Sequence, residues 1–234
     1  RTRIVAVRNN GISLCLINLL PSGHIPEHGQ LIPDPHGRGL PVAGEHAGLP
    51  DAQPVQSGAG RGFGLENIAV EVERGIKVNE VMQTNLPNVY AAGDVTGFSL
   101  LAHTASREAE VAVNHILGIE DRMEYNAIPG VVYTNPEVSS AGLTEEQAEK
   151  AGIEYKLYKL PMTYAGRFVA ENEGADGLCK IIVHKKNRTV LGVHMIGAYA
   201  GEIIWGAAQM LEMQLRVNDA RQIIFPHPTV SEII

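Results

Sequence analysis

The histidine of this sequence best suited to acid–base chemistry lies between two prolines, in the segment Phe225-Pro-His227-Pro-Thr-Val-Ser-Glu232. The proline rings restrict the backbone torsion φ on both sides, so we expect a stiff chain to present the imidazole of His227. Thr229 is expected to cap a helical turn that begins near Val230. Such a turn would bring the carboxylate of Glu232 back toward the ring.

A carboxylate bound to one nitrogen of an imidazole fixes the ring tautomer and raises the basicity of the other nitrogen. His227 and Glu232 are therefore candidates for a general base and the residue that orients it. The alternative is a turn histidine that binds the backbone, next to a glutamate that only favours the positive end of a helix dipole. The residue types by themselves leave both interpretations open.

A second candidate site follows a short apolar run, Asn88-Val-Tyr-Ala-Ala92. This run predicts a buried strand that ends at Gly93-Asp94, where Asp94 opens a loop. From Leu101 to Leu117 apolar residues recur at helical spacing, and Gly118 is a candidate C-cap. A strand, an acidic loop and a helix in this order are typical of an α/β domain.

The chain from about residue 125 onward predicts strands followed by helices. Thr144-Glu-Glu-Gln147 is a capping box, and Lys185-Lys-Asn-Arg188 is a polar turn between two β-rich segments. Helical spacing returns between Ile203 and Leu215, and a shorter helix is expected from Asn218. Strands are expected at residues 131–134, 155–160, 178–183 and 190–196. This order predicts an α+β unit with an antiparallel sheet.

The first sixty residues differ in composition from the rest. Between Pro21 and Pro54 there are seven prolines and four histidines, among glycines and without periodicity. We expect residues 1–62 to be irregular and of low order, either as a linker or as sequence foreign to the fold. The histidines are irregularly spaced and no cysteine or carboxylate cluster accompanies them, which disfavours a metal site. These four are His24, His28, His36 and His46.

Composition limits the class of protein. A chain of 234 residues with 44% hydrophobic content can build a globular core, and its net charge of −7 disfavours nucleic acid and anionic membranes as partners. No apolar run is long enough for a membrane span, and the start lacks both Met and a signal-peptide pattern. We therefore expect a cytoplasmic protein with a truncated N-terminus. Cys15 and Cys179 are too far apart in sequence to suggest a motif.

Several segments together resemble the signature set of the pyridine nucleotide-disulfide oxidoreductases, and within that family the dihydrolipoamide dehydrogenases. The resemblance extends from Phe63 to Ile234. The segments, in chain order, are Asn88-Val-Tyr-Ala-Ala-Gly-Asp94, Leu100-Leu-Ala-His103, Tyr133-Thr-Asn-Pro-Glu137, Gly192-Val-His-Met-Ile-Gly197 and His227-Pro-Thr-Val-Ser-Glu232.

The resemblance implies a fold class and a division into domains. Residues 63–124 would be a partial FAD/NAD-binding domain, the α/β remnant of the domain that binds FAD. Residues 125–234 would be an α+β interface or dimerisation domain, an antiparallel sheet with helices. Residues 1–62 stay unassigned.

The resemblance also implies roles for individual residues. His227 would take the proton of a dihydrolipoamide-type dithiol, and Glu232 would orient it. Asp94 would accept a hydrogen bond from a ribityl hydroxyl of FAD, while Leu100, Leu101, Ala102 and His103 would run beside the flavin. NAD would be the second cofactor. A homodimer and membership of a 2-oxo acid dehydrogenase complex are the implied partners.

The sequence departs from the family pattern in two motifs. It contains neither the Gly-x-Gly-x-x-Gly turn for FAD nor the Cys-x-x-x-x-Cys pair, and Gly58-Ala-Gly-Arg-Gly-Phe-Gly64 follows no clear strand. The chain by itself is therefore expected to be inactive. One alternative is a catalytically inactive fragment that serves only dimerisation or assembly. Another is a relative of glutathione or mercuric reductase. The residue after Glu232 is Ile233 and not a second glutamate, which disfavours the glutathione enzyme.

Overall fold

The computed structural model describes residues 4–9, 12–17 and 68–234, the first two ranges as backbone strands. The chain divides into two compact units, Arg1–Met123 and Glu124–Ile234, which are considered separately below. This division falls next to the boundary between residues 124 and 125 that the sequence suggested.

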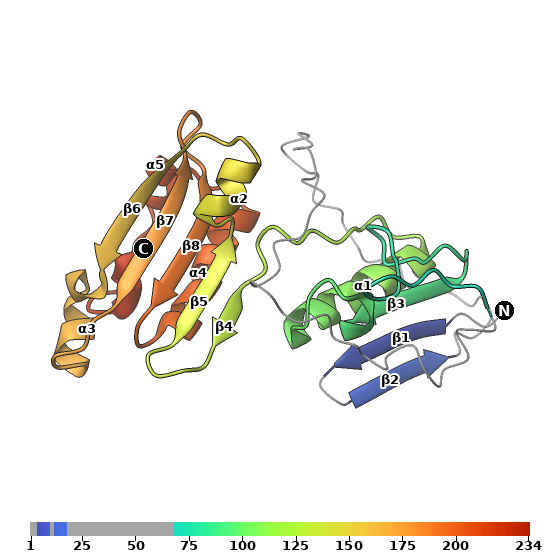
Figure 1. The fold of residues 1–234 in the computed structure, drawn as a ribbon. Helices are drawn as coiled ribbons and strands as arrows, with labels where there is room; N and C mark the ends of the chain where they lie inside the picture. The colour runs from blue at the N-terminus through green and yellow to red at the C-terminus, as the bar shows by residue number, and fades with distance from the viewer. Residues whose placement is uncertain (1–3, 10–11, 18–67) are drawn as a thin grey trace. The chain divides into compact units, whose positions relative to one another are not determined.

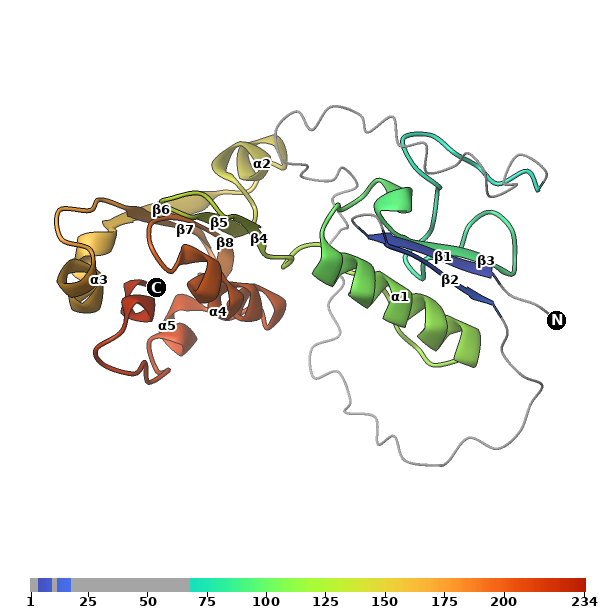
Figure 2. The ribbon, with the colours of Figure 1, turned by 90° about the horizontal axis from the view of Figure 1, so that it is seen from below.

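The first unit contains a three-stranded sheet and one long helix. The strand order is β2-β1-β3, with β1 antiparallel to β2 and parallel to β3. Helix α1 packs against β1 and β3, as Figure 2 shows from below. The bounds are β1 (Ile4–Asn9), β2 (Ile12–Ile17), β3 (Val89–Gly93) and α1 (Ala102–Leu117).

Two strands of this sheet correct the expectation that residues 1–62 are irregular. β1 and β2 lie within that range, and β1 is the central strand, with Ile4 paired to Val89. Both strands are short apolar runs rich in β-branched residues and leucine, a composition that suits strands. The proline- and glycine-rich stretch that follows them obscured this signal. Residues 18–62, with the four histidines, lie outside the described residues, as does the glycine run at 58–64.

Helix α1 begins and ends where the sequence predicted. Gly118 closes it in the left-handed conformation, at φ 79°, and its N–H bonds the carbonyls of Asn114 and His115. The Nδ1 atom of His115 lies 2.8 Å from the hydroxyl of Tyr90 on β3. Arg107 donates to both carboxylate oxygens of Asp121, at 2.8 and 2.6 Å, and so holds the segment after the helix.

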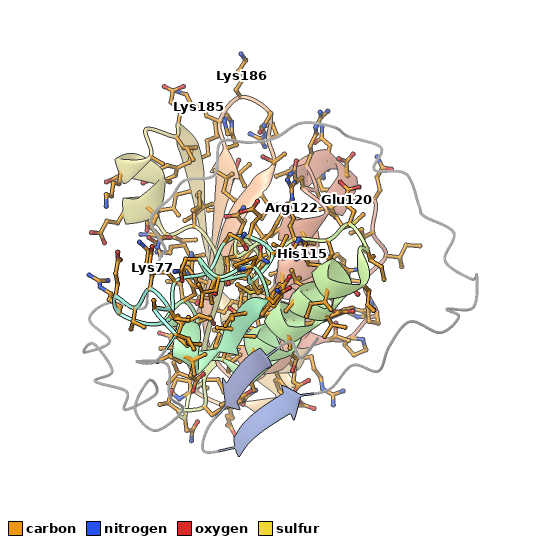
Figure 3. The ribbon with its side chains drawn as sticks, turned by 90° about the vertical axis from the view of Figure 1, so that its right-hand side faces the viewer. Lys77, His115, Glu120, Arg122, Lys185 and Lys186 are labelled. Carbon is orange, nitrogen blue, oxygen red and sulfur yellow. The ribbon has the colours of Figure 1, made fainter. Side chains whose placement is uncertain are left out.

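The second unit is built on a five-stranded sheet in the order β4-β5-β8-β7-β6, in which all neighbouring strands are antiparallel (Figure 1). The sheet predicted for residues 125–234 is confirmed, and β5 is a strand that the sequence did not reveal. Lys185 and Lys186 occupy the predicted turn between β7 and β8 (Figure 3). The bounds are β4 (Gly130–Val132), β5 (Val138–Gly142), β6 (Tyr155–Pro161), β7 (Leu178–His184) and β8 (Val190–Ile196).

Helices lie at both faces of this sheet. Helix α4 packs on β5 and β8 from one face, and α2 lies at the opposite face (Figures 1 and 2). The capping box predicted at the start of α2 is confirmed, because Thr144 and Gln147 exchange side-chain to backbone hydrogen bonds. The helices are α2 (Glu145–Lys150), α3 (Gly166–Glu171), α4 (Ala200–Glu212) and α5 (Val217–Ala220), with 3-10 turns η4 (Met162–Tyr164) and η5 (Val230–Ile233).

The core of the second unit lies between the sheet and α4. Alternate residues of the strands point to this face and meet the apolar stripe of the helix. Gly192 allows the close approach of the β5 end, since a Cβ there would lie 2.1 Å from the carbonyl oxygen of Leu143. Buried members of this core include Ala141, Met162, Phe168, Cys179, Val193, Met195, Ile204, Ala207, Val230 and Ile233.

Within the described parts of the chain, no helix combines the length and the apolar character needed to cross a membrane.

Candidate functional site

The structure brings His227 and Glu232 together at the C-terminal end of the second unit. The Nδ1 atom of His227 lies 2.9 Å from Oε1 and 3.2 Å from Oε2 of Glu232. The imidazole is 79% exposed, whereas the carboxylate is 29% exposed. The ring therefore has one nitrogen facing an anchored carboxylate, while most of its surface remains open to a substrate or a second protein.

The turn η5 explains why Glu232 is well placed. Val230 and Ile233 are 6% and 3% exposed in the core of the second unit, so they anchor the turn from its inner side. Glu232 projects from the same turn, and its Oε2 accepts a hydrogen bond of 2.9 Å from the N–H of Thr229. Thr229 is the N-cap of this turn, as the sequence predicted, and this bond belongs to a capping box of Thr229 and Glu232.

The hydroxyl of Thr229 closes the loop around the histidine. It donates to the carbonyl of Pro226 at 2.7 Å and lies 2.8 Å from the hydroxyl of Ser231. The peptide between His227 and Pro228 is cis. Residues 226–232 thus form one hydrogen-bonded loop with the imidazole on its outer side.

The electrostatics of this loop favour an ionised Glu232. The N–H of Thr229, and after it the ring of His227, hold the pKa of the Glu232 carboxyl below its usual value. An ionised carboxylate accepts a hydrogen bond from an Nδ1 that carries the proton. In this tautomer of the neutral ring, the other nitrogen, Nε2, keeps its lone pair. The arrangement can therefore take up a proton at Nε2 while Glu232 stabilises the resulting imidazolium.

Asp94 lies in the first unit, immediately after β3. It begins a 3-10 turn, η3 (Asp94–Thr96). Its Oδ1 atom is shielded from solvent and has no hydrogen-bond partner among the described residues. A buried carboxylate oxygen without a donor is costly, so this atom is suited to accept a hydrogen bond from a ligand hydroxyl.

The residues predicted to run beside the flavin lead into α1. Leu101 is the N-cap in an extended conformation, and no side chain caps the helix there. Ala102 and His103 form the exposed first turn, and Leu100 is 43% exposed. The positive end of this helix dipole can stabilise a negative charge placed against it. These four residues and Asp94 lie in the first unit, whereas His227 and Glu232 belong to the second.

A buried carboxylate that the sequence interpretation missed lies beside Asp94. Glu108 is 0% exposed, and its Oε2 accepts a hydrogen bond of 2.5 Å from the N–H of Gly93. Its position offered a signal, because Glu108 is three residues after Ala105 and four before Ala112, both of which are buried. A carboxylate on the apolar face of a helix indicates an internal partner.

Two further residues of reactive types, a cysteine and a histidine, have structural roles. Burial raises the pKa of the Cys179 thiol to about 12, so this cysteine is unreactive, as the sequence suggested. Burial lowers the pKa of His194, whose Nε2 lies 2.9 Å from the carbonyl oxygen of Leu143. Among residues 68–234, no three His, Cys, Asp or Glu side chains lie close enough to hold a metal ion.

Comparison with known families agrees with the division into two units. Residues 128–234 match the profile described as the pyridine nucleotide-disulphide oxidoreductase dimerisation domain. Residues 54–109 match the profile described as pyridine nucleotide-disulphide oxidoreductase. The chain belongs to the pyridine nucleotide-disulphide oxidoreductase family. Proteins of this family use FAD and NAD, and the predicted fold class is confirmed.

Relatives within the pyridine nucleotide-disulphide oxidoreductases include dihydrolipoyl dehydrogenases. The mitochondrial dihydrolipoyl dehydrogenase of Pisum sativum is 40% identical over 83% of this chain and 40% of its own length. The human enzyme is 40% identical over 74% of this chain and 34% of its own length. A leghemoglobin reductase of Glycine max is 39% identical over 83% of this chain and 38% of its own length. The chain thus spans about two fifths of these relatives.

Solved structures of this family share the fold. LpdA from Mycobacterium tuberculosis matches with a TM-score of 0.69 and 25% identity, over 74% of this chain and 38% of that one. The HOCl-induced flavoprotein disulfide reductase RclA from Escherichia coli matches with a TM-score of 0.62 and 27% identity, over 71% of this chain and 39% of that one.

Proposed function

We propose that this chain supplies the acid–base and part of the flavin-binding machinery of a dihydrolipoyl dehydrogenase, which oxidises a dihydrolipoamide-type dithiol with FAD and NAD. The observation that supports the proposal most directly is the contact of 2.9 Å between the exposed ring of His227 and the anchored carboxylate of Glu232. The identity to dihydrolipoyl dehydrogenases of pea and human supports the choice of substrate class.

His227 acts on the proton of a thiol. Only a thiolate attacks a disulfide, so the dithiol must lose a proton before its sulfur can react. The Nε2 lone pair takes this proton, and Glu232, bound to Nδ1, stabilises the positive charge that the ring acquires. The proton returns from the same nitrogen when the reaction runs in reverse.

Asp94 and the start of α1 are proposed to contact FAD. The Oδ1 atom that has no donor among the described residues fits a ribityl hydroxyl. The helix end without a side-chain cap, next to Leu100, Leu101, Ala102 and His103, fits the negatively charged edge of a reduced flavin. When bound, FAD supplies the two-electron redox chemistry, with NAD as the final acceptor.

The test for the histidine is complementation within a dimer. The chain is mixed with a full-length dihydrolipoyl dehydrogenase whose own equivalent histidine has been replaced, and formation of NADH from dihydrolipoamide is measured. We expect turnover to recover with the unaltered chain and to stay absent with His227→Gln. Proven mixed dimers that do not recover would contradict the role of His227. The matched control is His184→Gln, a histidine on the same unit and outside the proposed site.

A homodimer is the proposed assembly. The match to a dimerisation domain supports it. So does a row of neighbouring apolar side chains across the sheet, exposed by 38 to 48%, at Val132, Val138, Leu178 and Ile196. Sedimentation equilibrium is expected to give twice the chain mass. Membership of a 2-oxo acid dehydrogenase complex follows only from the relatives and is tested by co-purification with such a complex.

A second candidate is a chain that assembles but does not catalyse by itself. It is favoured by the sequence, in which Cys15 and Cys179 cannot form the Cys-x-x-x-x-Cys pair of the family. Incubation of the purified chain with FAD, NAD and dihydrolipoamide is expected to give no NADH under either candidate. The complementation assay distinguishes the two, because a chain that only assembles would not restore turnover. A glutathione or mercuric reductase relative would instead turn over its own substrate in the complementation assay.

The cytoplasmic location expected from the sequence stays a prediction. The pea and human relatives are named mitochondrial, so fractionation of the source cells is the measurement that decides.

A further inference from the structure

The Glu108 carboxyl occupies an internal position on helix α1. Helix α1 packs this face against β3, and the residue is 0% exposed. A carboxyl group loses its hydration in such a place and needs an internal hydrogen-bond partner. The N–H of Gly93, which donates to Oε2 at 2.5 Å, is such a partner.

Gly93 is the residue before Asp94, and the turn that begins there is held from more than one side. The hydroxyl of Thr96 donates to the Gly93 carbonyl at 2.9 Å, within the turn itself. The N–H of Ile76 donates to the carbonyl of Val95 at 2.7 Å, from a segment outside the turn. Glu108 adds the contact from α1. Together with the hydrogen bond of 3.2 Å from the N–H of Gly97 to the carbonyl of Asp94, these contacts set the direction in which Asp94 leaves β3.

The backbone of Gly93 adopts φ 82° and ψ −157°, a conformation that glycine permits and other residues avoid. Glycine is flexible, so the torsions of this residue are not fixed by its own sterics. An external hydrogen bond on its N–H restricts them. The carboxylate of Glu108 is in the correct place to do so.

We propose that Glu108 is a positioning residue of the flavin site: its buried carboxylate holds the amide of Gly93 and so aims Asp94 at the ribityl hydroxyl. This inference rests on the proposed role of Asp94 in binding FAD. Glu108 itself touches neither flavin nor substrate in this scheme, and it acts through the backbone at the end of β3.

The first measurement needs no flavin. The amide proton of Gly93 is followed by NMR in the 234-residue chain, in Glu108→Gln and in Glu108→Met. Replacing the carboxyl by an amide changes the acceptor of this hydrogen bond, so the signal is expected to shift in Glu108→Gln. In Glu108→Met the amide is expected to exchange with solvent about tenfold faster, because the bond is lost. Glu108→Gln is close in shape to the natural residue and serves if Glu108→Met does not fold.

The matched control is Glu110→Gln on the same helix. Glu110 is 64% exposed and pairs with Arg107 on the surface. Its substitution makes the same change of a carboxyl to an amide on α1 without touching the turn. We expect the Gly93 signal and its exchange rate to stay as in the unaltered chain.

The second measurement is the affinity for FAD, by titration of flavin fluorescence. We expect the dissociation constant to rise about tenfold in Glu108→Met and less in Glu108→Gln, as for other residues that orient a ligand-binding group. Glu110→Gln should bind FAD as the unaltered chain does.

The outcomes separate this inference from the proposed function. The inference is overturned if the shift and exchange rate of the Gly93 amide are unchanged in both Glu108 variants. It is also overturned if the amide exchanges faster while the dissociation constant for FAD stays the same. If the unaltered chain binds no FAD, the flavin site is overturned, and with it the link from Glu108 to flavin. The exchange of Gly93 then still shows whether Glu108 holds this turn.

Discussion

The Nδ1 atom of His227 lies 2.9 Å from Oε1 of Glu232, and the second oxygen of this carboxylate accepts the N–H of Thr229. Both contacts favour the ionised carboxylate, so the pKa of Glu232 is lowered from 4.5. We expect an NMR titration of its side-chain carbon to have a midpoint below 4.5. Because the pKa is lowered on folding, the contribution to stability is complete above the unfolded value and is lost as pH falls through the folded one.

The two contacts can be separated by His227→Ala. Since the N–H of Thr229 is the larger cause, the pKa of Glu232 should rise in this variant but remain below its usual value. A midpoint that does not move would mean that the ring contact is absent in solution. Unfolded chain in urea gives the reference midpoint.

Burial of Ile233 is expected to hold the loop that presents Glu232. Ile233→Ala should lower the free energy of unfolding of the second unit by about 2 kcal/mol, from lost burial and the cavity left behind. The measurement is urea unfolding, followed by circular dichroism. Ile224→Ala is the matched control, because this side chain is 93% exposed and its loss should change stability by less than about 0.5 kcal/mol. Equal effects would contradict the packing of η5.

Two glycines of the second unit should respond in opposite directions to alanine. A Cβ at Gly192 would lie 2.1 Å from the carbonyl oxygen of Leu143, so Gly192→Ala should destabilise the unit by about 2–3 kcal/mol. Gly206 lies within α4 with open space around its Cα, so Gly206→Ala should stabilise it by about 0.5–1 kcal/mol. Thermal unfolding of both variants checks the signs. A stable Gly192→Ala would show that β5 and β8 can move apart.

Cys179 is expected to resist thiol reagents in the folded chain. With its pKa raised to about 12, only about one thiol in 10⁴ is ionised at pH 8, and the side chain is 0% exposed. In a Cys15→Ser variant, Cys179 is the remaining thiol, and its reaction with a disulfide reagent should be complete only after urea is added. Rapid reaction without denaturant would mean that the sheet opens at β7.

Prediction from sequence worked best where a local pattern has one structural solution. The strand that ends at Asp94, the helix closed by Gly118 and the capping box at Thr144 depend on neighbours in the chain, and all three are present. β1 and β2 were missed because a central strand is recognised by its partners, and the partner of β1 is β3, which lies far along the chain. β5 was missed because Val138–Gly142 is rich in small residues and lacks a clear alternation.

The sequence by itself determined the candidate dyad of His227 and Glu232. One stiff turn separates these two residues, so residue type and spacing are enough to predict their contact. Only the tertiary structure decided what holds that turn, because Val230 and Ile233 are anchored by a core drawn from the whole second unit. The same holds at β3, where fifteen residues separate Glu108 from Gly93. A contact of this kind requires the helix to fold back onto the strand, and no local pattern specifies it.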